Sequence, residues 1–241
     1  MQTAFAMKGK RRNVFNIKFM GRFKDEEVLK QKPLPPNAVP YNEGGLADVV
    51  RKGFLISLPW QIIMFVSVFC RYLQVRERMP GEAIRDVPSF FSVLTVDTTD
   101  SVLMNTVISL IALIGINILL TVLHELIHAV TVPQGHEVQV WSYLDKGAMF
   151  VFFPEPVSRL RFVAVSLAPN IVLAFIPWLI LLVAAPLLPG QAYWWIFIQA
   201  FLMSVGGIGD YANVWHTLTQ VPKGGLVHSY GLNSYWTPPA S

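Results

Sequence analysis

Residues 107–132 read VISLIALIGINILLTVLHELIHAVTV, an apolar run that ends in two histidines and a glutamate. A helix needs about 20 mostly apolar residues to cross a bilayer, and this run is long enough. Three further stretches of the chain meet the same requirement, namely residues 54–73, 162–188 and 193–218. We therefore predict an all-α polytopic membrane protein with about four transmembrane helices.

The composition agrees with a membrane protein. Hydrophobic residues make up 53% of the 241 residues and charged residues only 14%, whereas a soluble domain carries roughly 25% charge. This imbalance excludes a soluble enzyme. The single cysteine, Cys70, excludes an intramolecular disulfide and a thiolate metal cluster.

The basic residues predict the orientation of the chain. Of the 19 Lys and Arg residues, 11 precede Phe54, next to the first apolar run. This placement fits membrane topology and anionic lipid rather than nucleic acid, so we expect a lipid bilayer and no nucleic acid as partner. We divide the chain into a basic cytoplasmic segment, residues 1–53, and a membrane domain, residues 54–241. With four spans in the cell membrane, both termini and the 133–161 loop are cytoplasmic.

The 133–161 loop has an unusual pattern. Residues 138–143 alternate loosely, Asp145-Lys146-Gly147 can form a turn, and residues 149–153 are apolar and favour strands. Two interpretations are open: an interfacial β-hairpin between the second and third spans, or an ordinary loop with aromatic anchors.

The chemistry is concentrated where the second span ends, in the HExxH sequence of residues 124–128. Positions four apart share one face of a helix, so His124 and His128 can bind one zinc ion. Glu125 can then deprotonate a water molecule bound by the zinc, as the catalytic base of a metalloprotease. Ionisable groups inside an apolar helix are functional by default, because they are costly unless paired or liganded.

A catalytic zinc also needs a third protein ligand. Asp210 is our first choice. His124 lies 17 residues from Val107 and Asp210 lies 16 residues from Trp194, which places both about 25 Å along their helices at 1.5 Å per residue. Glu155, on the loop after HExxH, is the alternative third ligand. The other candidates are His136, Glu137, Asp145, Asn170 and His216.

The third span contains Ala168-Pro169-Asn170. Proline frees a backbone carbonyl in a helix, and an asparagine inside a membrane seeks a hydrogen-bond partner. Asn170 could orient a ligand, brace the hairpin or polarise a substrate carbonyl in catalysis, or it could only repair the break made by the proline.

These motifs together resemble a known group of enzymes. HExxH at the end of a span, APN in the next span and a late Gly209-Asp210 pair are similar to site-2-protease-like intramembrane zinc metalloproteases. The sequence most resembles the bacterial "putative zincin peptidase" membrane proteins over roughly residues 105–235. The resemblance implies zinc held by His124, His128 and Asp210, with Glu125 as general base.

The predicted function is hydrolysis of a peptide bond in a membrane protein or peptide, at the cytoplasmic side of the bilayer. The 138–153 segment could bind an extended part of this substrate by β-addition. The alternative is a non-proteolytic zinc-binding membrane protein or a cation transporter. Glu125 argues against a purely structural zinc, and transport would require more ionisable residues in the spans. The sequence does not define the substrate or the oligomeric state.

Overall fold

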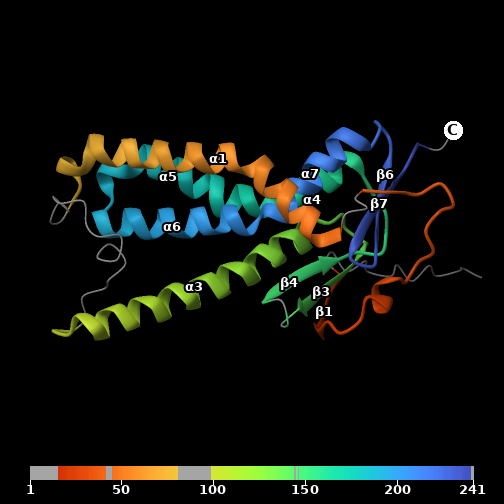
Figure 1. The fold of residues 1–241 in the computed structure, drawn as a ribbon, viewed down its shortest axis with the longest axis horizontal. Coiled ribbons are helices and arrows are strands. Elements are labelled where there is room, and N and C mark those ends of the chain that lie inside the picture. Colours follow the sequence, from red (N-terminus) through yellow and green to blue (C-terminus); the bar gives the residue numbers. More distant parts are fainter. Residues whose placement is uncertain (1–15, 42–44, 81–98, 144, 146, 240–241) are drawn as a thin grey trace, which may run out of the picture.

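The structure is a computed structural model that describes residues 16–41, 45–80, 99–143, 145 and 147–239. Long helices extend from one end of the molecule, and two β-sheets gather at the other end (Figure 1). The strands are β1 (Asn16–Arg22), β2 (Val39–Pro40), β3 (Glu137–Tyr143), β4 (Ala148–Phe152), β5 (Val157–Ser158), β6 (Leu226–Tyr230) and β7 (Asn233–Thr237). The α-helices are α1 (Gly45–Val75), α3 (Val102–Thr131), α4 (Arg159–Asn170), α5 (Ile176–Ala184), α6 (Gly190–Gly206) and α7 (Ile208–Gln220). Shorter helical turns are η1 (Glu26–Leu29), η2 (Arg76–Arg78), η4 (Ile171–Phe175) and η5 (Ala185–Leu187).

Three helical stretches among the described residues are long and apolar enough to cross a membrane: Ala47–Arg78, Val102–Thr131 and Arg159–Leu187. The prediction of four spans is wrong, because the stretch expected at 193–218 is not one continuous helix. It consists of α6 and α7, which meet at a bend of 49°. Gly206 and Gly207 lie at the break. Glycine favours such a break because it lacks a Cβ and is a poor helix former.

The third span is continuous but not regular. Pro169 lies inside α4, and the five residues that follow α4 form a π-helical turn, η4, before α5 begins. Proline lacks the N–H that would bond to the carbonyl four residues earlier, so the helix must adjust its hydrogen bonding there. This irregularity lies next to the candidate metal ligands described below.

The prediction of an all-α protein is also wrong, because the described strands form two sheets. One sheet has the strand order β1-β3-β4, and the other has the order β2-β7-β6-β5. β3 and β4 form the antiparallel hairpin that was one of the two interpretations of the 133–161 loop. Gly147, at φ +61°, lies in its turn, where glycine adopts the left-handed conformation most readily.

The sheets depend on pairings between distant segments. β1 runs parallel to β3, and β2 pairs with β7 near the C-terminal end. We call residues 16–41, which contain β1 and β2, the N-terminal strap. The strap therefore contributes a strand to each sheet, although the sequence alone marked this region only as basic.

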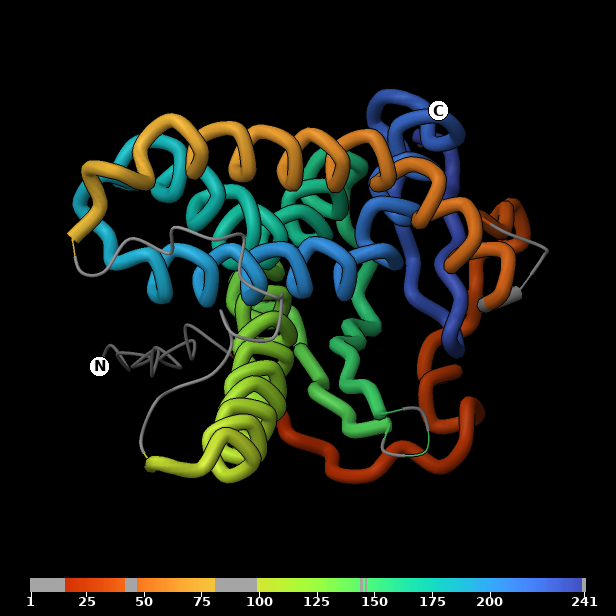
Figure 2. Tube along the Cα trace, turned by 60° about the vertical axis from the view of Figure 1, so that its left-hand side comes forward, coloured from red at the N-terminus to blue at the C-terminus, as the bar shows by residue number. Residues whose placement is uncertain are grey.

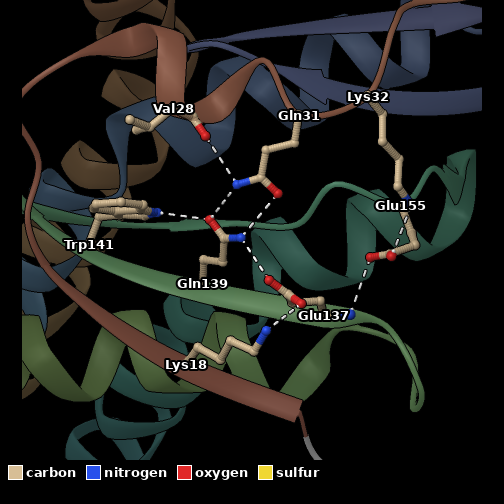
Figure 3. A network of polar contacts seen from close by, with 8 residues as sticks. All are labelled: Lys18, Val28, Gln31, Lys32, Glu137, Gln139, Trp141 and Glu155. Carbon is tan, nitrogen blue, oxygen red and sulfur yellow. Dashed lines mark hydrogen bonds and ion pairs between the residues drawn. The ribbon is translucent and has the colours of Figure 1, made fainter.

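Charged and amide side chains fasten the strap to the hairpin region (Figure 3). Its ion pairs are Lys18–Glu137 at 2.6 Å, Arg22–Asp145 at 2.5 Å and Lys32–Glu155 at 3.0 Å. At the centre, the buried amide of Gln139 exchanges hydrogen bonds with Gln31 and accepts one from the Trp141 indole N–H. Polar groups buried in such a network must remain paired, so the network holds the strap against β3.

An apolar cluster joins the sheets to the helices that carry the site. It includes Ala129 and Val132 at the end of α3, Val138 and Val140 in β3, and Phe162 in α4. Side chains of the strap and of the C-terminal strands, Tyr41 and Val227, complete the cluster. The end of α3 is thus held on several sides, while its first half stands apart from α1 and α6 (Figures 1 and 2).

Candidate metal centre

The two histidines of HExxH lie on the last turns of α3. Their Nε2 atoms are 3.1 Å apart, and their side chains are only 12% and 11% exposed. Residues four apart in a helix lie one above the other, so both rings point toward the same place. This convergence comes from the local helix alone.

Asp210 completes a group of three on the first turn of α7. Its Oδ2 lies 3.1 Å from His124 Nε2 and its Oδ1 lies 3.2 Å from His128 Nε2. The candidate ligand atoms of these residues all lie within 4.8 Å of one another. α7 starts after the bend at Gly207, and the Asp210 amide N–H donates to the Gly207 carbonyl at 3.0 Å. The bend between α6 and α7 therefore brings the carboxylate to the histidines.

The donor set fits zinc. Two imidazoles and one carboxylate are the ligand types of catalytic zinc sites, which keep a fourth position open for water or substrate. Among the described residues, no other group of three histidine, cysteine, aspartate or glutamate side chains is close enough to hold one ion.

Two contacts from α4 orient these ligands. His128 Nδ1 lies 2.8 Å from the Val165 carbonyl oxygen, and Asn170 Nδ2 donates to Asp210 Oδ2 at 2.9 Å. A carbonyl can only accept, so His128 carries its proton on Nδ1 and leaves the Nε2 lone pair free for a metal.

Glu125 lies one residue after His124 and is 9% exposed on α3. It is not one of the three clustered ligands. It can therefore remain available as an acid–base group beside them.

The other ligand candidates have different partners. Glu155 pairs with Lys32 and accepts a hydrogen bond from the Glu137 amide N–H, so it takes part in the sheet network rather than in the histidine group. Glu137 and Asp145 pair with the strap, and the hydrogen bond from Lys18 lowers the pKa of the Glu137 carboxyl. His216 Nδ1 contacts the Gln220 amide.

Residues 117–226 match the family model described as "Putative zincin peptidase". The match supports that family for this part of the chain. The matched region contains both histidines, Glu125, the APN segment and Asp210. No curated protein and no solved structure matches the chain.

The match to the zincin peptidase family points to a metallopeptidase and to zinc as its metal, which agrees with the donor set of the cluster. The expected zinc cofactor is thereby confirmed. The family match begins inside α3 and does not cover the N-terminal strap or α1.

Sequence reasoning missed two features around the centre. The Val165 carbonyl was not identified, although Pro169 four residues later indicates that this carbonyl lacks its usual helical donor. The strap was not identified as strand-forming, although Ile17 and Phe19 alternate with polar residues in its first strand.

Proposed function

We propose that the protein is a membrane-embedded zinc metallopeptidase that hydrolyses a peptide bond of a membrane-associated substrate near the cytoplasmic face. The observation that carries this proposal is the convergence of His124 and His128, at the end of a helix that is apolar enough to cross a bilayer, with Asp210 of α7. The zincin peptidase family match over the same residues supports it.

His124, His128 and Asp210 would hold the zinc ion, each through one nitrogen or oxygen atom. Zinc in such a site supplies Lewis acidity, which polarises the scissile carbonyl and makes the attacking water more acidic. The three residues leave the remaining position to water and substrate. Their low exposure keeps the ligands away from bulk solvent.

Glu125 is the proposed general base. It would accept a proton from the attacking water and pass it to the amine that leaves when the peptide bond breaks. It follows His124 directly on α3 and is nearly buried there. We assign no catalytic contact with substrate to Asn170, whose amide nitrogen is already engaged with Asp210.

The sheets support the proposed orientation. β1 pairs with β3 and β2 pairs with β7, so the strap, the hairpin and the C-terminal strands lie at one end of the helices (Figure 1). All three would therefore be on the same side of the membrane, whatever the number of crossings. The 11 basic residues before Phe54 favour the cytoplasm for that side.

A substrate has to present an extended segment, because a helix hides its carbonyls in its own hydrogen bonds. In the sheet β1-β3-β4, the hairpin strand β3 is paired on both sides, and β4 is the outer strand. β4 also contacts α3, the helix that carries HExxH. If the hairpin binds substrate by β-addition, β4 rather than β3 offers the edge.

The competing function is a non-proteolytic zinc protein or a cation transporter. A structural zinc normally has four protein ligands, whereas the described group has three. A transporter would hold further liganding groups along its helices, and the described residues contain no second cluster of this kind. Both observations favour a peptidase.

The test is a comparison of the purified protein with its Glu125→Gln variant in lipid nanodiscs. We expect both to bind close to one zinc per chain, and only the unmodified protein to cleave peptides derived from membrane proteins. Equal cleavage by the two proteins, or no zinc in either, would overturn the proposal.

A further inference from the structure

We propose that Pro169 and Asn170 of the APN segment are positioning residues that fix the orientation of two of the three candidate metal ligands. Pro169 would act on His128 through the Val165 carbonyl, and Asn170 on Asp210 through its own amide. This inference rests on the proposed zinc site, and it concerns residues that touch neither the ion nor the substrate.

The role of Pro169 follows from helix geometry. In an α-helix the carbonyl of residue i accepts from the N–H of residue i+4, and the fourth residue after Val165 is Pro169, which has no N–H. The Val165 carbonyl therefore lacks its usual donor and is 2.8 Å from His128 Nδ1. The proline thus provides the acceptor that fixes the His128 tautomer and the direction of its Nε2 lone pair.

The role of Asn170 follows from its packing. Its side chain is completely buried, and its Nδ2 lies 2.9 Å from Asp210 Oδ2. On the other side it touches Gly207, where an added Cβ would lie 2.7 Å from the Asn170 Cγ. Gly207 has an ordinary φ of −78°, so glycine is required here for space and not for backbone conformation. The amide is thus confined between Gly207 and the carboxylate.

Fold stability alone does not explain these two residues. Proline inside a helix removes a hydrogen bond, and the buried Oδ1 of Asn170 has no hydrogen-bond partner in the part of the chain that the structure describes. Both features cost stability. Each, however, gives a metal ligand one fixed hydrogen-bond partner, as expected of residues that orient the ligands of a catalytic metal.

Substitution of Pro169 makes a prediction that a purely structural role would not make. In Pro169→Ala the restored N–H would compete with His128 for the Val165 carbonyl. We expect the metal-free protein to melt at an equal or higher temperature, while the zinc Kd weakens about 10- to 100-fold. Pro177→Ala, at the start of α5, is the matched control and should leave the zinc Kd unchanged.

Substitution of Asn170 separates hydrogen bonding from packing. Asn170→Leu keeps the number and branching of the side-chain heavy atoms but cannot donate, so we expect a similar loss of zinc affinity and a changed visible spectrum of the cobalt-substituted protein. Gly207→Ala should weaken zinc in the same way by displacing the amide, whereas Gly206→Ala, which has open space around it, should not.

A double variant tests the coupling directly. Once the amide is removed in Asn170→Ala, a methyl group at residue 207 no longer collides with it. Asn170→Ala/Gly207→Ala should therefore bind zinc about as well as Asn170→Ala alone, so that the two effects do not add.

The outcomes distinguish this inference from the proposed function. If the unmodified protein binds zinc and cleaves peptides, but Pro169→Ala and Asn170→Leu keep its zinc Kd and cobalt spectrum, the positioning role is wrong and the proposed function stands. If the unmodified protein binds no zinc, the proposed function fails and the positioning role fails with it.

Discussion

The Nε2 atoms of His124 and His128 lie 3.1 Å apart, and each faces a different oxygen of the Asp210 carboxylate. Three candidate ligands from two helices that are far apart in the sequence therefore converge without the help of any loop. Groups placed on regular elements hold their geometry better than groups on loops, which suits a catalytic metal.

The first prediction is that this cluster accounts for the zinc content. His124→Ala and Asp210→Ala should each lose most of the bound zinc, because two ligands do not hold the ion at normal affinity. Zinc per chain, measured by elemental analysis after dialysis, checks this. Glu155→Gln is the control, since Glu155 pairs with Lys32, and it should keep its zinc. If Glu155→Gln loses its zinc while Asp210→Ala keeps it, the third ligand is Glu155 and not Asp210.

The second prediction concerns orientation. In a Cys70→Ala background, single cysteines replace Lys24 in the strap, Lys223 before β6 and Asp100 at the start of α3; all three positions are exposed. Lys24 and Lys223 belong to the sheet end, and Asp100 belongs to the opposite end of the helices.

We expect a membrane-impermeant thiol reagent to label only the cysteine at position 100 in intact cells. All three should react after the cells are opened. Labelling at 24 and 223 but not at 100 in intact cells would place the sheet end outside, and the proposed cytoplasmic site would be wrong.

The third prediction concerns the link between the strap and the hairpin. Gln139 is 2% exposed, and its side-chain oxygen accepts hydrogen bonds from Gln31 and from the Trp141 indole. Gln139→Ala leaves the buried indole N–H of Trp141 without its acceptor, so it should lower the free energy of unfolding by about 1–3 kcal/mol. Chemical denaturation followed by tryptophan fluorescence measures the change. The same substitution at the exposed Gln74 should have almost no effect, and equal effects at both positions would argue against a structural network around Gln139.

The fourth prediction concerns pH. The hydrogen bond from Lys18 lowers the pKa of Glu137 below its ordinary value of 4.5. A carboxyl whose pKa is lower in the folded state stabilises that state above its ordinary pKa, and the contribution disappears as the pH falls through the lowered value. The contribution of the Lys18–Glu137 pair to the attachment of the strap to β3 should therefore decrease in acid and be constant near neutral pH.

A fluorophore on a cysteine at Met20, again in a Cys70→Ala background, can report this release. Glu137→Gln should abolish the acid-dependent part of the signal, and Glu27→Gln, whose partner is Lys30 within the strap, should not. The pair is partly exposed, so the effect should be small and should decrease with added salt. If both variants show the same acid transition, the release is caused by the titration of groups other than Glu137.

The fold was predictable where the signal is local. Long apolar runs predicted helices over the three stretches that could cross a membrane. The fourth run was predicted as one helix because hydropathy does not register a bend, and only the contact of Gly207 with Asn170 shows why glycine is needed at that break. The strands of the strap and of the C-terminal segment were missed because they are short and pair with distant partners.

What the sequence by itself determined is the spacing of His124 and His128 on one helix face and the missing N–H at Pro169, since both follow from the repeat of the α-helix. Only the tertiary structure decided which carboxylate meets the histidines and which donor the Val165 carbonyl receives. Asp210 and Glu155 are both plausible ligands by residue type. Packing of α7 against α4 brings Asp210 to the histidines, while Lys32 of the strap binds Glu155 at the sheet. These choices depend on contacts between residues 37 or more positions apart, and no local pattern encodes them.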